Sequence, residues 1–338
     1  MVRCAILRRT LALGFMLLLS AAAQAQLFRA YLAPSGVDTN PCTLPSPCRL
    51  LPAALAAVAN GGEIWMLDSA NYNTASVVID KSVTILAVPG VEGSILSTLG
   101  AAIYITTPGV KVVLRNLLIV PLAGSASTTG ISMSGGAGLT VEKCVIANMT
   151  GNGIIMSGAA SLRITDSTIR DNGVYGVFLQ DGVRATVTRA TVSGNANAGI
   201  YLHAIAAGVT TTADIADSTL DGNQYGVYAW SQNATAVLKV SVRDSRALRN
   251  IIAGLMANSS VGGVVTLSAS NNIVSNNGSG IVANQSGSKV WTSGNTVSEN
   301  VTGLSNPNNF GVFESANNNA VRNNGVETSG AITTFATK

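Results

Sequence analysis

The stretch Gly176–Asn223 reads GVFLQDGVRATVTRATVSGNANAGIYLHAIAAGVTTTADIADSTLDGN, and it contains a short phrase that recurs along most of the chain. The phrase is Gly, an apolar residue, any residue, and usually a second apolar residue. It starts at glycines 130, 153, 176, 199, 226, 254 and 280, so the steps are 23, 23, 23, 27, 28 and 26 residues. A fixed period in the twenties predicts a solenoid.

An asparagine precedes most of these glycines by a few residues. Asparagine tolerates the left-handed backbone of a sharp turn, and its amide can donate to one coil and accept from another. We therefore predict a structural asparagine ladder along one edge, and interpret its glycosylation-like triplets as by-products. The predicted ladder consists of Asn148, Asn172, Asn195, Asn223, Asn250, Asn277 and Asn300, with Asn324 as a weaker continuation.

Each coil also has a second strand signal, as in Leu162-Arg163-Ile164, followed by a small polar turn. A coil this short has no room for a helix, but it holds three short strands that pair in parallel with the next coil at about 4.8 Å. The prediction is an all-β fold, a single-stranded right-handed parallel β-helix of roughly ten coils.

The sequence divides into four parts. Residues 1–25 read as a signal peptide, 26–62 as an N-terminal cap, 63–325 as the β-helix and 326–338 as a polar C-terminal tail in which 332–335 add a last edge strand. Within the cap, Phe28–Ala33 alternates as a strand does. Arg49–Val58 has a helix pattern with Pro52 in its first turn, and its apolar side is expected to cover the open end of the solenoid.

The pattern resembles the right-handed parallel β-helix (PbH1) repeat of the pectin-lyase-like superfamily, and the segment 33–64 is similar to the N-terminal cap of its secreted bacterial members. The resemblance spans roughly residues 28–325. It implies the fold, while the superfamily includes pectate lyases, polygalacturonases and proteins without known activity, so it does not define a function.

The N-terminal residues indicate export. Arg3, Arg8 and Arg9 precede a short apolar run, 11–19, and Ala23-Gln24-Ala25 is a cleavage site. We predict a secreted protein, periplasmic or extracellular, without a membrane anchor. Loss of the three leader arginines takes Lys+Arg from 20 to 17 against 16 acids, so the mature chain is close to neutral. Nucleic acid and membrane are therefore not the expected partners.

Three cysteines remain after the leader. Cys42 and Cys48 flank a proline-rich loop, and in an oxidising compartment we predict a local disulfide between them. A metal site is the rival interpretation, but neither His nor a further Cys lies nearby. Cys144 follows a strand-like run and is expected to be a small core residue.

Carboxylates within the coils are the candidate catalytic groups. The acids available within the coils are Asp166, Asp214, Asp217, Asp221 and Asp244, and arginines such as Arg163 and Arg184 lie among them without an evident pattern. A hard cation needs several convergent oxygens, and the sequence has no dense acidic cluster. We interpret these acids as solvated turn carboxylates and expect no metal and no cofactor, with Ca²⁺ entering only if the protein is a lyase.

An aromatic stripe is the better candidate site. Side chains alternate along a strand, so the residues two and four positions after each glycine point outward. The longer coils then gather aromatic and polar side chains on one face beside the only histidine. These predicted glycan-binding residues are Phe178, Gln180, Tyr201, His203, Tyr228 and Trp230. The alternatives are a segment packed over the stripe or an association surface.

The sequence is compatible with two candidate functions. The first is a secreted, non-catalytic β-helix protein that binds a polysaccharide or cell-surface glycan, or has a structural role. The second is a lyase or glycoside hydrolase acting on an acidic polysaccharide. We lean away from an enzyme because no motif defines a reaction, and we discount an ice or mineral binder because the outward rows are mixed.

Overall fold

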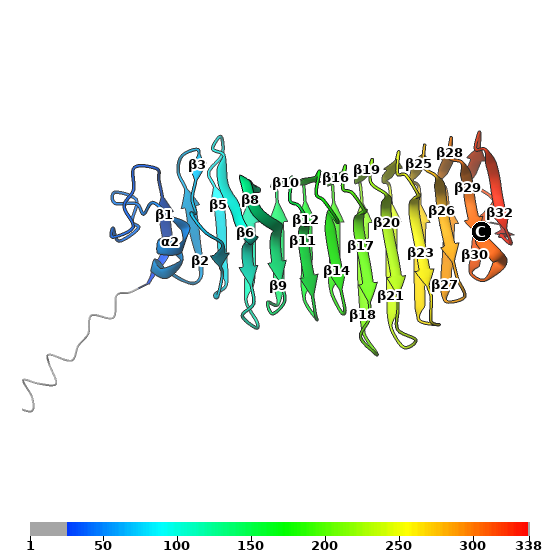
Figure 1. The fold of residues 1–338 in the computed structure, drawn as a ribbon, viewed down its shortest axis with the longest axis horizontal. Helices are drawn as coiled ribbons and strands as arrows, with labels where there is room; N and C mark the ends of the chain where they lie inside the picture. Colours follow the sequence, from blue (N-terminus) through cyan, green and yellow to red (C-terminus); the bar gives the residue numbers. More distant parts are fainter. Residues whose placement is uncertain (1–25, 337–338) are drawn as a thin grey trace, which may run out of the picture.

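The computed structural model describes residues 26–336. They form a rod of stacked coils, which Figure 1 shows from the cap at the blue end to the last strands at the red end. The predicted all-β, right-handed parallel β-helix with an N-terminal helical cap is confirmed. The predicted signal peptide, residues 1–25, lies outside the described residues.

One side of the rod is a sheet of thirteen parallel strands. Successive coils each contribute one strand to it, because β-branched and apolar residues alternate with polar ones. The strands are β1 (Leu27–Leu32), β2 (Val58–Met66), β5 (Val83–Ala87), β7 (Lys111–Arg115), β9 (Gly138–Glu142), β12 (Ser161–Thr165), β15 (Arg184–Thr188), β18 (Thr210–Ala216), β21 (Val237–Arg243), β24 (Val264–Ser270), β27 (Ser288–Ser293), β30 (Val312–Ala316) and β33 (Thr333–Phe335).

The two other sides carry the short strands and the glycine strands. The short strands are β10 (Val145–Ala147), β13 (Thr168–Arg170), β16 (Thr191–Ser193), β19 (Thr219–Asp221), β22 (Arg246–Leu248), β25 (Ile273–Ser275), β28 (Thr296–Ser298) and β31 (Ala320–Arg322). The glycine strands are β11 (Asn152–Ser157), β14 (Val177–Gln180), β17 (Ala198–Ala204), β20 (Tyr225–Ser231), β23 (Ala253–Ser259), β26 (Ser279–Asn284), β29 (Thr302–Asn306) and β32 (Val326–Gly330).

Nearer the cap the coils are less regular. Strands β3 (Ala70–Asn71) and β4 (Val77–Val78) pair with the long strand β6 (Gly93–Ile105), which pairs in turn with β8 (Leu117–Met133). A 3-10 turn, η1 (Pro307–Asn309), follows β29. Residues 326–336, expected as a tail with one edge strand, contain two strands, because β32 pairs with β29 and β33 with β30.

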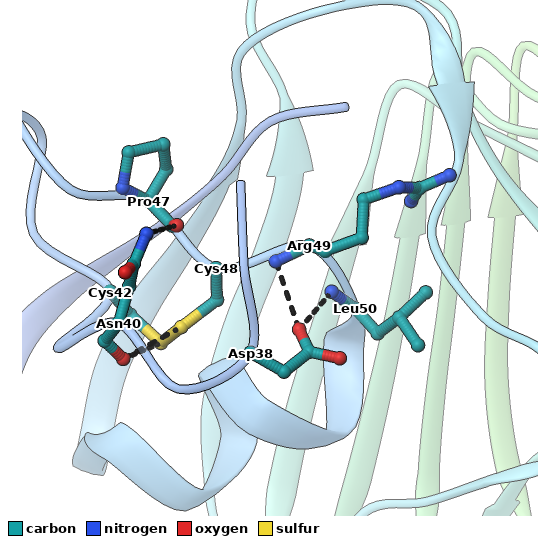
Figure 2. Close-up of a disulfide and its surroundings, with 7 residues drawn as sticks. All are labelled: Asp38, Asn40, Cys42, Pro47, Cys48, Arg49 and Leu50. Atoms are coloured by element: carbon teal, nitrogen blue, oxygen red, sulfur yellow. Dashed lines mark hydrogen bonds between the residues drawn. A yellow bond between two sulfur atoms is a disulfide. The ribbon is translucent and has the colours of Figure 1, made fainter. Parts of the chain in front are cut away.

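The cap helix α2 (Leu51–Ala57) is shorter than the predicted Arg49–Val58, since Val58 already starts β2. Its start is held by Asp38, whose Oδ1 accepts hydrogen bonds from the backbone N–H groups of Arg49 and Leu50 at 2.9 and 2.7 Å (Figure 2). Cys42 and Cys48 form a disulfide in the same loop, with Cα atoms 4.6 Å apart. Within residues 26–336 no helix is long and apolar enough to cross a membrane.

The core is a set of rows in which like residues lie one coil above another. Ile154, Val177, Ile200, Val227, Leu255 and Ile281 pair in register and are completely buried. The recurring glycine beside this row is required by space. A Cβ on Gly176 would lie 2.6 Å from the Gly199 carbonyl oxygen and 2.9 Å from the Asn195 amide nitrogen. The glycine therefore recurs in each coil because the asparagine ladder beside it leaves no space for a side chain.

The asparagine ladder is confirmed from Asn172 to Asn324. From Asn195 to Asn324, each Oδ1 accepts from both the backbone N–H and the side-chain amide of the asparagine one coil before it, at 2.8–3.2 Å. Because these amides are buried, the ladder supplies hydrogen bonds that water cannot.

The assignment of Asn148 to the ladder is wrong. Asn148 is exposed with φ of 63°, and its neighbour Met149 occupies the ladder position, where its backbone N–H donates to Asn172 Oδ1 at 3.2 Å. The left-handed residue of this corner comes directly before the ladder residue, as Asp171, Arg249 and Asn276 also show. The ladder asparagines are thus chosen for their amides rather than for a left-handed backbone.

A second, unpredicted ladder lines the corner between the thirteen-stranded sheet and the short strands. It starts with serines and changes to asparagines: the Ser245 N–H donates to Asn272 Oδ1, and Asn272 donates to Asn295. Cys144 lies at the same position, where its N–H donates to Ser167 Oγ. Burial raises the pKa of the Cys144 thiol to about 12, as expected of an inert core cysteine.

Candidate functional site

The aromatic stripe lies on the glycine strands, at the positions that the spacing from each glycine predicts. Ile155, Phe178, Tyr201, Tyr228 and Met256 are in register, and so are Ser157, Gln180, His203, Trp230 and Asn258. Both rows lie on the outer face of the glycine strands, so the six predicted residues are neighbours over β14, β17 and β20.

The rings of this stripe cover one another. Tyr201 lies between Phe178 and Tyr228, with centroids 5.1 and 5.3 Å away and planes within 22°. Tyr175, which the sequence did not single out, also stacks on Tyr201 at 4.6 Å, and Tyr225 stacks on Tyr228 at the same distance. Only 3% of the Tyr201 surface is exposed. We call Tyr175, Phe178, Tyr201, His203, Tyr225, Tyr228 and Trp230 the aromatic stack.

Polar partners hold the rim of the aromatic stack. His203 Nε2 lies 2.7 Å from Gln232 Oε1, and Trp230 Nε1 donates to Ser260 Oγ at 3.3 Å. The Tyr228 hydroxyl accepts from Asn258 Nδ2 at 2.9 Å. Burial raises the pKa of Tyr201 and of Tyr228, the latter to about 12. These contacts are those of a packed surface layer.

This geometry does not offer a broad aromatic platform. A sugar ring stacks on the open face of an aromatic side chain, whereas most ring faces of the aromatic stack already contact another ring. The stripe therefore has the character of a structural element.

A hollow lies on the outer face of the thirteen-stranded sheet instead, with a volume of about 850 Å³. It runs from β7 to β24 and crosses seven strands, which is roughly 29 Å at about 4.8 Å per strand. We call it the sheet groove. Its outward-pointing residues include Lys111, Thr140, Arg163, Arg184, Thr186, Thr212, Asp214, Lys239, Ser241 and Thr266.

The sheet groove is basic. Lys111, Arg163, Arg184 and Lys239 line it, and none of the four has a carboxylate within 4.0 Å among the described residues. Of the residues that line it, Asp214 is the single carboxylate, and its Oδ1 lies 3.9 Å from Nε of Arg243. Unpaired cations among hydroxyl groups form a surface suited to an anionic, hydroxyl-rich ligand.

The other acids lie at corners and edges of the coils. Asp166 accepts two hydrogen bonds from Arg189, at 2.7 and 3.0 Å, and this exposed pair lowers the pKa of Asp166. Asp217 and Asp244 occupy the same left-handed corner in later coils. Asp221 pairs with Arg249. Of the acids that the sequence proposed, only Asp214 reaches the sheet groove.

Arg163 and Arg184 have no pattern in the sequence until the second strands of the coils are aligned. The register Arg163↔Thr186↔Asp214↔Ser241 and Ser161↔Arg184↔Thr212↔Lys239 places them on one face. Lys111 and Lys239 were not proposed from the sequence. Aligning the apolar residues of these strands, such as Leu162 with Ala185, is the signal that identifies all four.

Comparison with known proteins agrees with this architecture. A family model described as a right-handed beta helix region matches residues 90–243. A search of the curated proteins finds no match. Over the described residues the chain has the fold of a right-handed parallel β-helix, and the matching family model covers less than half of the sequence.

Among solved structures, the pectate lyase Pel9A aligns with a TM-score of 0.65 and 17% identity, over 84% of this chain and 78% of the lyase. The Dettilon tailspike protein (gp208) aligns with a TM-score of 0.54 and 14% identity, over 90% of this chain and 68% of that one. Likeness at these identities defines the fold alone.

Proposed function

We propose that this is a carbohydrate-binding β-helix protein that holds an anionic polysaccharide along the sheet groove. The observation that carries the proposal is the group of four cations, Lys111, Arg163, Arg184 and Lys239, that face one groove without carboxylate partners among the described residues. Charge-assisted hydrogen bonds from guanidinium and ammonium groups recognise carboxylates or sulfates, and the intervening threonine and serine hydroxyls recognise sugar hydroxyls.

Binding without catalysis is the function that the groove chemistry favours. Hydrolysis of a glycosidic bond generally uses two carboxylates in defined roles. Among the residues that line the sheet groove, Asp214 is the single carboxylate. A lyase remains the second candidate, because the groove of basic side chains lies on a fold shared with the pectate lyase Pel9A. Release of unsaturated products from polygalacturonate by the purified protein would favour the lyase.

We place this binding outside the cytoplasm. Residues 1–25 have the sequence of a signal peptide, and the disulfide between Cys42 and Cys48 fits an oxidising compartment. N-terminal sequencing of the protein recovered from the producing cells tests the placement, with Gln26 expected as the first residue. An intact Met1 on the recovered protein would contradict it.

The test of binding compares two charge-matched double variants. R184Q/K239Q removes two groove cations, and R246Q/R322Q removes two exposed arginines from the short strands β22 and β31. A charged hydrogen bond contributes about 1.5–3 kcal/mol, so we expect the groove variant to bind polygalacturonate at least about tenfold more weakly. Isothermal titration calorimetry at low salt measures both.

The control variant should bind as the parent protein does. Equal weakening by both pairs would mean that only net charge matters, and unchanged binding by R184Q/K239Q would contradict the groove. An oligonucleotide of the same charge serves as a counter-probe. Tighter binding of the oligonucleotide than of the glycan would also overturn the proposal.

A further inference from the structure

One row of the thirteen-stranded sheet alternates between cations and threonines. Arg184 pairs with Thr212, Thr212 with Lys239, Lys239 with Thr266, and Thr266 with Lys289, each one strand further along the rod. The three cations are exposed and the two threonines are half-buried. This alternating part of the row begins at Arg184 inside the sheet groove and continues one strand past its end, to Lys289 on β27. On the other side of Arg184 the same row holds Ser161, Gly138 and Lys111.

The alternation sets a charge spacing. Neighbouring strands are about 4.8 Å apart, so the cations of this row recur every ~10 Å with one hydroxyl between them. The length of one pyranose unit in an extended glycan is comparable to this strand spacing. Cations two strands apart are therefore in step with every second sugar of a glycan that lies along the rod.

We propose that the sheet groove selects a glycan that carries one anionic group per disaccharide over a glycan charged on every sugar. The inference rests on the proposed function and names its ligand class. Arg184, Lys239 and Lys289 would meet the anionic sugars, while Thr212 and Thr266 would meet the neutral sugars between them. A ligand charged on every sugar would set half of its carboxylates beside threonine, where the nearest cations of the row lie one strand spacing away and compensate less for lost hydration.

The same alternation has a purely structural explanation, because like charges on directly opposed residues of neighbouring strands repel each other. That explanation predicts no ligand preference. Binding measurements on two probes of equal carboxylate number separate the two: hyaluronan oligosaccharides, with one carboxylate per disaccharide, and oligogalacturonates, with one per sugar.

We expect the parent protein to bind the hyaluronan oligosaccharide at least about tenfold more tightly in calorimetric titration at fixed salt, which corresponds to about 1.4 kcal/mol. K239T, which puts threonine at a site between two threonines, should reduce that preference. T212K/T266K should reverse it by adding the missing cations. T212Q/T266Q keeps the length of the new side chains without charge and should not reverse it, and circular dichroism verifies that each variant is folded.

Equal affinity for the two probes, or tighter binding of oligogalacturonate, would overturn the inference and leave the groove proposal standing, provided that R184Q/K239Q still weakens binding. An equal gain for both probes in T212K/T266K would overturn it as well. Failure of the parent protein to bind either probe would overturn both the inference and the proposed function.

Discussion

The aromatic stack and the sheet groove lie on two outer faces of the same solenoid. The coil repeat places similar side chains next to one another on the first face and alternates different side chains on the second. On the glycine strands, Phe178, Tyr201 and Tyr228 lie one coil apart with ring centroids separated by 5.1–5.3 Å, so the rings stack on one another. On the thirteen-stranded sheet, the row from Arg184 to Lys289 alternates cations with threonines, so no two of its cations are direct neighbours. A repeat that aligns identical apolar side chains builds structure, whereas a repeat that separates charges leaves them for a ligand.

The largest expected effect is loss of the ring at the centre of the aromatic stack. Tyr201→Ala removes a ring that is 3% exposed and packed between neighbours, and should lower the free energy of unfolding by about 3–5 kcal/mol. Urea denaturation measures the loss. Tyr201→Phe keeps the packing and should cost less than about 1 kcal/mol.

Glycan affinity of the folded Y201A protein distinguishes the two faces, because the aromatic stack is not the proposed binding face. Affinity should stay within about twofold of the parent, a change of roughly 0.4 kcal/mol. A large loss of glycan affinity with little loss of stability would restore the aromatic stack as the binding site.

The next effect concerns the buried asparagine ladder at the corner between the short strands and the glycine strands. Asn223→Ala removes the amide that donates to Val192 O at 3.1 Å and to Asn250 Oδ1 at 3.2 Å, and it leaves the Asn195 N–H without its acceptor. Each unsatisfied buried group costs about 1–3 kcal/mol, so the variant should lose at least about 2 kcal/mol of unfolding free energy.

Asn148→Gly is the matched control for N223A. Its exposed, left-handed corner favours glycine, and the change in stability should stay within about 0.5 kcal/mol. Equal destabilisation by the two variants would contradict the position of the ladder one residue after the left-handed corner.

Alkaline pH should weaken the aromatic stack. Burial raises the pKa of Tyr228 from its ordinary value of 10.0 to about 12. A group whose folded pKa is raised contributes stability that is complete below its unfolded pKa and is lost as pH rises through the folded value. Stability should therefore decrease between pH 10 and 12, and less so in Tyr228→Phe, as thermal melts across this range would show. An identical pH profile in Y228F would contradict the assignment.

The smallest effect on stability belongs to the sheet groove. Lys239→Gln changes an exposed side chain without an ion pair among the described residues, so unfolding free energy should change by no more than about 0.5 kcal/mol. A loss above 1 kcal/mol, on the scale of a packed residue, would mean that the groove cations serve the fold.

The sequence predicts the register between neighbouring coils well because a glycine and an asparagine recur at equivalent positions in most coils. Gly176 has no space for a Cβ, and its ladder neighbour Asn195 bonds at fixed geometry, so their spacing directly reports the coil length. The outward rows follow from strand alternation. The corner is harder to predict: Asn148 and Met149 differ by one position, and the sequence does not show which of them turns inward.

The site was less predictable for two physical reasons. Membership of a row places Phe178 and Tyr201 side by side, but ring rotation decides whether they form an open platform or a closed stack. The groove cations come from strands whose connecting turns vary in length, so Arg184 and Lys239 align only when the apolar residues between them are paired coil by coil.

The most direct test asks which face touches the glycan. A uronic-acid oligosaccharide with a photoreactive group can be crosslinked to the protein, and the modified peptides identified by mass spectrometry. We expect adducts on β12, β15, β18 and β21, around Arg163, Arg184 and Lys239. Adducts concentrated on β17 and β20, at His203 and Trp230, would contradict this expectation.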